Sequence, residues 1–145
     1  MTALALALLL GGAPAKAAPA PHVENENWVI DARVEPAPKQ GQPSTLLVQL
    51  DTRNGFHLNE DYPINFKADA ETGFEKAKAS KGDGVELAPG DAKGEEKHRA
   101  LVRLRFNPRA PGQALVGGVF AFSSCSAERC LIDKIEVRVQ VDVTK

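Results

Sequence analysis

The chain has 145 residues and a formal net charge of −1, with 18 basic and 19 acidic side chains. This length suits one domain with its own core. The balanced charge argues against a nucleic-acid-binding protein, because such a protein needs a basic surface to displace counterions.

The start of the chain is typical of an export signal. Residues 3–10 are all apolar, which is too short for a membrane-spanning helix of about 20 residues but suits the hydrophobic region of a signal peptide. Ala15 and Ala17 supply a cleavage site, although no Lys or Arg precedes the apolar run. We predict a leader over residues 1–22, a mature domain over residues 23–145 without a membrane span, and a periplasmic location. The alternative is a disordered Ala/Pro leader on a cytosolic protein.

After the leader, the sequence pattern predicts strands. Residues 99–106 and 135–143 alternate between apolar and polar side chains, which is typical of strands with one buried and one wet face. Less regular runs extend the prediction to residues 28–34, 45–51, 56–58, 64–68 and 115–122. Residues 71–81 have helically spaced charges, but Gly73 interrupts them, so we expect at most a short turn there. This succession predicts an all-β, immunoglobulin-like antiparallel β-sandwich, with Trp28 and the six phenylalanines in its core.

Cys125 and Cys130 are the only cysteines, and they lie between two predicted strands. At the tip of a β-hairpin this separation can bring two Cβ atoms to about 4 Å, within disulfide range. An even number of cysteines in an exported chain favours a disulfide. Closing so short a loop stabilises a fold by only about 2 kcal/mol. Arg129 would favour a reactive thiolate and Glu128 would oppose it, so the residues alone leave a structural and a redox-active disulfide open.

Two segments carry a resemblance to a known family. Residues 54–68 read Asn-Gly-Phe-His-Leu-Asn-Glu-Asp-Tyr-Pro-Ile-Asn-Phe-Lys-Ala, and residues 122–131 read Phe-Ser-Ser-Cys-Ser-Ala-Glu-Arg-Cys-Leu. The first resembles the glycine-aromatic-x-Leu segment of the N-terminal periplasmic domain of the thiol:disulfide interchange protein DsbD. The second resembles the cysteine hairpin of that domain. The order of the segments also matches, and the similarity covers residues 25–143.

The resemblance implies an immunoglobulin-like sandwich that passes electrons by dithiol–disulfide exchange. Cys125 and Cys130 would be the exchanging residues, with Cys130 attacked first, and Phe56 would pack near the hairpin. The partners would be thioredoxin-fold proteins or a membrane thiol-electron transporter, and no cofactor is implied. The chain departs from the larger family members after the second cysteine, where Leu131 replaces an aromatic residue that two prolines follow. Residues 85–98 also lack the aromatic that caps the disulfide in those members.

The remaining polar residues do not indicate a metal, hydrolase or phosphate-binding site. His57 lies near Glu60 and Asp61, and His98 follows Glu96; a metal site could include them, but we interpret both as solvated loop histidines and predict no metal. Neither a nucleophile elbow nor a phosphate-binding loop occurs in the sequence. The alternative function is an exported immunoglobulin-like binding module whose hairpin disulfide fixes a recognition loop.

Overall fold

The computed structural model describes residues 18–91 and 94–145. Most of the predicted leader lies outside these residues. Within them the chain is all-β, which confirms the predicted fold class at this level. The strands are β1 (His22–Glu24), β2 (Trp28–Glu35), β3 (Ser44–Thr52), β4 (His57–Leu58), β5 (Asn65–Ala68), β6 (Lys78–Lys81), β7 (Gly84–Ala88), β8 (Arg99–Phe106), β9 (Gly112–Cys125) and β10 (Cys130–Val143). The described part contains no helix of the length and apolarity that crossing a membrane requires.

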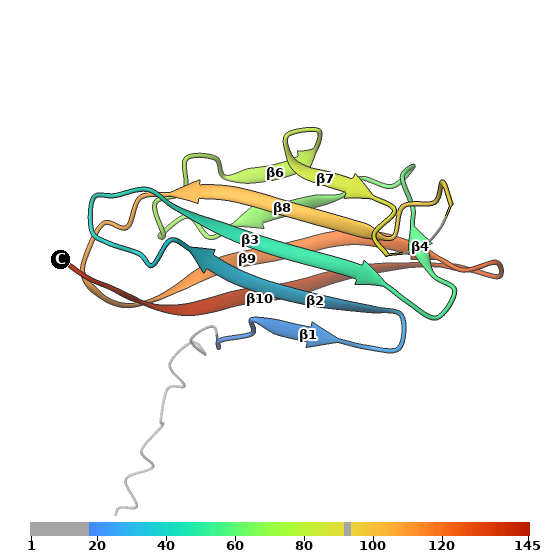
Figure 1. Ribbon diagram of the computed structural model, residues 1–145, viewed down its shortest axis with the longest axis horizontal. Helices are drawn as coiled ribbons and strands as arrows, with labels where there is room; N and C mark the ends of the chain where they lie inside the picture. The colour runs from blue at the N-terminus through green and yellow to red at the C-terminus, as the bar shows by residue number, and fades with distance from the viewer. Residues whose placement is uncertain (1–17, 92–93) are drawn as a thin grey trace, which may run out of the picture.

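The strands form one continuous hydrogen-bonded sheet in the order β1-β2-β3-β8-β7-β6-β5-β9-β10, and β4 pairs with β9. Apart from the parallel pair of β6 and β7, the described strands pair antiparallel. The sheet folds over, so that β2 and β3 lie across from β9 and β10 (Figure 1). Ala20 exchanges backbone hydrogen bonds with Arg138 of β10, so the two ends of the sheet almost meet. Because the sheet is continuous, the immunoglobulin-like arrangement of two separate sheets stays a prediction.

The apolar alternation in the sequence explains how β3 and β8 pair. Three cross-strand pairs are buried on one face, namely Leu46 with Leu104, Val48 with Val102, and Leu50 with Ala100. Directly opposed residues of an antiparallel pair point to the same face, so each pair adds two side chains to the same core. The sequence pattern did not predict the short strands β1, β6 and β7. β6 lies within residues 71–81, where we expected at most a short turn.

Aromatic rings connect the two halves of the folded sheet. The ring of Trp28 on β2 meets the ring of Phe122 on β9 edge-on, with centroids 5.5 Å apart. Phe122 in turn packs on Phe120, and Phe120 packs on Phe66 of β5. The core prediction is confirmed for Trp28 and for every phenylalanine except Phe74, which is only half-buried.

Arg138 is an exception to the alternation of β10. The pattern placed Arg138 on the wet face, but the residue is only 8% exposed. Its guanidinium donates hydrogen bonds to Asp69 from Nε at 2.8 Å and from Nη2 at 3.1 Å. Gly117 lies opposite Arg138, and a Cβ on Gly117 would approach Arg138 Cγ to 2.8 Å. The arginine is therefore buried because a glycine leaves room for its side chain and a carboxylate neutralises its charge.

β9 and β10 together form a long two-stranded ribbon, which we call the ribbon. Its register runs without interruption from Gly112 opposite Val143 to Cys125 opposite Cys130. Most of the ribbon lies within the sheet, and its turn projects beyond the neighbouring strands, at the right of Figure 1. We call residues 125–130 the hairpin tip.

Candidate functional site

A disulfide joins Cys125 and Cys130 at the hairpin tip. The two residues are direct register partners, with Cα atoms 4.0 Å apart. The Ser126 amide donates to the Arg129 carbonyl oxygen at 2.8 Å, so these residues form a hydrogen-bonded pair. The cysteines therefore occupy the adjacent non-hydrogen-bonded position, where opposed side chains come closest. The bond and its place in a hairpin match the sequence prediction, while its chemical role stays a prediction.

Ser126 fixes the turn that holds the two cysteines together. Its Oγ accepts hydrogen bonds from the backbone amides of Glu128 at 3.2 Å and Arg129 at 3.3 Å. A hydroxyl that binds the following amides is a common way to stabilise a tight turn. Glu128 and Arg129 are themselves exposed, so their opposite charges both lie in solvent beside Cys130.

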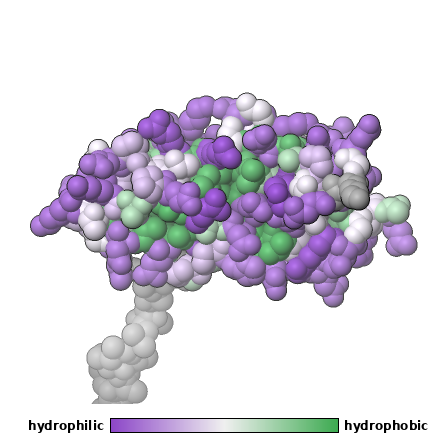
Figure 2. Space-filling view, viewed as in Figure 1, coloured by the Kyte–Doolittle hydropathy of each residue, from purple (hydrophilic) through white to green (hydrophobic). Residues whose placement is uncertain are grey.

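The two bonded cysteines differ sharply in exposure. Cys125 is only 7% exposed, whereas Cys130 is exposed to solvent. The difference follows from topology: at Cys125, β9 is flanked by both β4 and β10, while β10 is the last strand of the sheet. A small hydrophobic area marks the same projecting end in Figure 2, next to hydrophilic side chains. A bulky nucleophile can therefore approach the sulfur of Cys130 more readily than that of Cys125.

β4 brings His57 to the disulfide. His57 is the register partner of Cys125, so His57, Cys125 and Cys130 form one row across three adjacent strands. Opposed residues share a face of the sheet, which puts the imidazole on the same face as the disulfide. Phe56, directly before His57, is 7% exposed and thus buried at this end of the sheet. Its predicted packing against the hairpin stays a prediction.

His57 belongs to a small polar cluster that the sequence did not reveal. Its Nδ1 lies 3.6 Å from Glu96 Oε2, and His98 Nε2 lies 3.8 Å from the same oxygen. His98 Nδ1 is 2.9 Å from Thr52 Oγ1. The side chains of His57 and His98 are 31% and 21% exposed, so neither is a fully solvated loop residue as expected. The local sequence gave no signal of this cluster, because β4 and residues 94–98 are far apart in the chain and come together in the fold, where the Leu58 amide donates to the Lys97 carbonyl oxygen.

The part of the chain that the structure describes contains no group of three or more His, Cys, Asp or Glu residues arranged to hold a metal ion.

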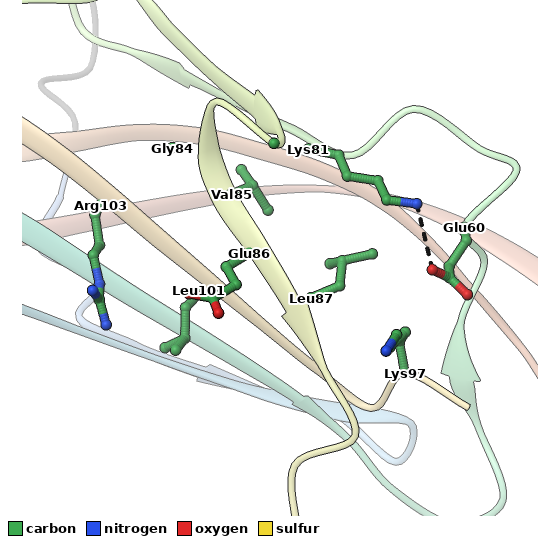
Figure 3. A pocket seen from close by; sticks show the side chains of 10 residues that line it. Glu60, Lys81, Gly84, Val85, Glu86, Leu87, Lys97, Leu101 and Arg103 are labelled. Atoms are coloured by element: carbon green, nitrogen blue, oxygen red, sulfur yellow. Dashed lines mark hydrogen bonds and ion pairs between the residues drawn. The ribbon is translucent and has the colours of Figure 1, made fainter. Parts of the chain in front are cut away.

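A groove of about 480 Å³ lies against β7 and β8, near the end of β4 (Figure 3). It has an apolar floor and a charged rim, and its lining includes Glu60, Lys81, Val85, Glu86, Leu87, Lys97, Leu101 and Arg103. Lys81 Nζ reaches Glu60 Oε1 across the rim at 3.4 Å. No cysteine or histidine lines this groove, so the candidate chemistry is located at the hairpin tip.

Comparisons with protein-family models, with curated proteins and with solved structures found no match to this chain. The resemblance to the DsbD family therefore stays a prediction.

Proposed function

We propose that this protein is a thiol–disulfide exchange module that relays electrons between thioredoxin-fold partners in the periplasm. The observation that carries the proposal is the unequal exposure of the two bonded cysteines at the projecting hairpin tip. An exchange module needs one sulfur that a partner can reach and a second that can close the bond again. In this proposal Cys130 is the sulfur that partners attack and Cys125 is the one that resolves the intermediate.

The exchange proceeds through a mixed disulfide. A thiolate of the donor attacks Cys130 Sγ, a new sulfur–sulfur bond forms, and Cys125 leaves as a thiolate that takes up a proton. The second thiol of the donor then attacks the donor's own sulfur in the mixed disulfide and releases Cys130 as a thiol. The donor dithiol is oxidised to a disulfide, and the module now carries two electrons and two protons. The reverse sequence reduces an acceptor disulfide, and no cofactor takes part.

Ile132 supports a partner contact beside Cys130. It is the one large hydrophobic residue that is strongly exposed in the described part of the chain, at 61%. Residues two apart on a strand point to the same face, so Ile132 shares the face of Cys130. A small apolar contact of this kind suits a transient interface, which must release each partner after exchange.

The reduction potential of the Cys125–Cys130 pair tests the proposal. We expect a midpoint above about −300 mV, within reach of thioredoxin-fold partners. The measurement is equilibration of the purified protein with dithiothreitol buffers, read by alkylation of the free thiols. A lower potential would mark the bond as structural and would favour the binding-module alternative.

Trapping experiments test the assignment of Cys130 as the attacked residue. The variant Cys125→Ser keeps the exposed Cys130 and removes the resolving thiol, so it should accumulate a mixed disulfide with a periplasmic thioredoxin-fold protein. The matched variant Cys130→Ser keeps only the buried Cys125 and should trap far less. Equal trapping by both variants would contradict the proposed order of attack, and no trapping by either would contradict exchange.

A further inference from the structure

His57 is the neighbour of Cys125, and not of Cys130, in the strand register beside the disulfide. In the row that crosses β4, β9 and β10, His57 is next to Cys125, and Cys130 lies on the far side of Cys125. Directly opposed residues have Cβ atoms about 4.5–5.5 Å apart, a spacing that an imidazole ring can cover. The ring is 31% exposed, so it also contacts solvent.

Cys125 is the residue whose thiolate is costly to form without a proton donor nearby. When a partner attacks Cys130, Cys125 leaves as a thiolate at a position that is only 7% exposed. A negative charge with so little water around it is costly, and a proton from a neighbouring group removes that cost. In the reverse direction the Cys125 thiol must lose a proton before it can attack. Imidazole is the side chain that can perform both transfers near neutral pH.

The surroundings of His57 suit proton transfer to and from solvent. Glu96 Oε2 lies 3.6 Å from Nδ1, and the Glu96 side chain is 65% exposed. This exposed carboxylate is close enough to attract a protonated ring and favour its orientation, while His98 approaches the same oxygen at 3.8 Å. The other charged residues on the neighbouring segments are Glu60, Asp61, Glu95, Lys97, Arg99, Glu128 and Arg129.

We infer that His57 donates a proton to Cys125 when the disulfide opens and removes that proton when it closes, an inference that rests on the proposed function. During opening, the proton moves from the imidazolium to Cys125 Sγ as the bond to Cys130 breaks, and the neutral ring regains a proton from solvent. During closing, the neutral ring takes the Cys125 proton. The resulting thiolate attacks Cys130 Sγ in the mixed disulfide, and the partner leaves as a thiolate. Glu96 is a positioning residue in this scheme.

The test is the pH dependence of disulfide opening by dithiothreitol, with the rate constant expressed per reductant thiolate. Measured from about pH 5 to pH 8, this constant should fall for the wild-type protein as the pH rises, because only a protonated imidazole can donate. For His57→Gln it should be flat, and at pH 6 it should be about tenfold lower than for wild type, a modest contribution for a general acid. At pH 8 the two proteins should react at similar rates.

His22→Gln is the matched control, because His22 lies on β1 and is paired with Asp31. It should show the wild-type profile. A His57→Gln profile that coincides with wild type, or that is slower by the same factor at every pH, would overturn the inference. The wild-type profile alone is also decisive: a constant value across this range overturns the inference even where the variant fails to fold.

The reductant in this experiment is a small molecule, so the result does not depend on any protein partner. A pH profile as expected, together with a potential below about −300 mV or no trapped partner, would reject the proposed function while the proton transfer stands. A flat profile with successful trapping would reject the role of His57 alone.

Discussion

The middle of the ribbon and its tip are made from the same two strands but are held in different ways. In the middle, Phe120 and Phe122 are fully buried, and Gly118 is so close to β5 that a Cβ would lie 2.0 Å from the Lys67 carbonyl oxygen. At the tip, the two-residue strand β4 is the only neighbour of the ribbon among the described strands, and the turn is exposed. A covalent bond joins the two strands next to this exposed turn.

The two regions therefore differ in what holds the strands of the ribbon together. The rings of Trp28, Phe66, Phe120 and Phe122 connect β2, β5 and β9 by packing and not through the disulfide. We therefore expect the domain to stay folded when the disulfide opens. Variants that damage one region and leave the other intact measure how independent the two regions are.

The largest effect should come from truncation in the middle of the ribbon. Phe120→Ala removes a fully buried ring that packs on both Phe66 and Phe122. We expect the free energy of unfolding to fall by about 3–5 kcal/mol. Denaturant unfolding followed by Trp28 fluorescence measures it. Phe74→Ala is the control, because its ring is half-buried, and it should cost clearly less; equal losses would contradict the idea that the ribbon centre carries the stability.

A change of one methyl group compares the stability of the two regions with a smaller perturbation. Gly117→Ala would place its Cβ 1.9 Å from the Val137 carbonyl oxygen, so the paired strands would have to move apart. We expect a loss of about 3 kcal/mol, at the upper end for overpacking. The counterpart at the tip, Ala127→Gly, removes one methyl group from an exposed turn residue and should change stability by less than about 0.5 kcal/mol. Similar losses of unfolding free energy in the two variants would contradict the distinction between the middle and the tip.

The sequence predicted those parts of the fold whose information is local. Residues 99–106 form a strand with the predicted bounds, because period-two alternation is read within one segment. The hairpin tip was also local, since both cysteines and the turn lie within six residues. The exposure of Arg138 was predicted wrongly, because its burial depends on Asp69, which approaches from far along the chain.

The candidate site was predictable only in part, for the same reason. Cys125 and Cys130 could be chosen from their spacing, but their unequal exposure could not, because it depends on β4 covering one side of β9. The approach of Glu96 to His57 likewise requires two distant segments to meet. The histidine was visible in the sequence, but its register opposite Cys125 was not.

Removing the disulfide should have a smaller effect than damage to the middle. The double variant Cys125→Ser with Cys130→Ser should lose about 2 kcal/mol, because the bond closes only a short loop in the unfolded chain. The far-ultraviolet circular dichroism spectrum and the denaturant slope should stay as in the wild type. Unfolding of the double variant in buffer would contradict the separation of the two regions.

The smallest effect should come from His22 at the edge of the sheet, which belongs to neither region. A hydrogen bond to Asp31 at 2.6 Å raises the pKa of His22 above its ordinary value of 6.5. A raised folded-state pKa contributes stability that is complete below pH 6.5 and is lost as the pH rises through the folded value. The difference in unfolding free energy between wild type and His22→Gln should therefore shrink from pH 6 to pH 8, and it should be smaller at high salt because the pair is exposed. A difference that grows with pH would contradict the sign of this linkage, and any effect of His22→Gln on disulfide opening would show that the sheet edge and the hairpin tip are coupled.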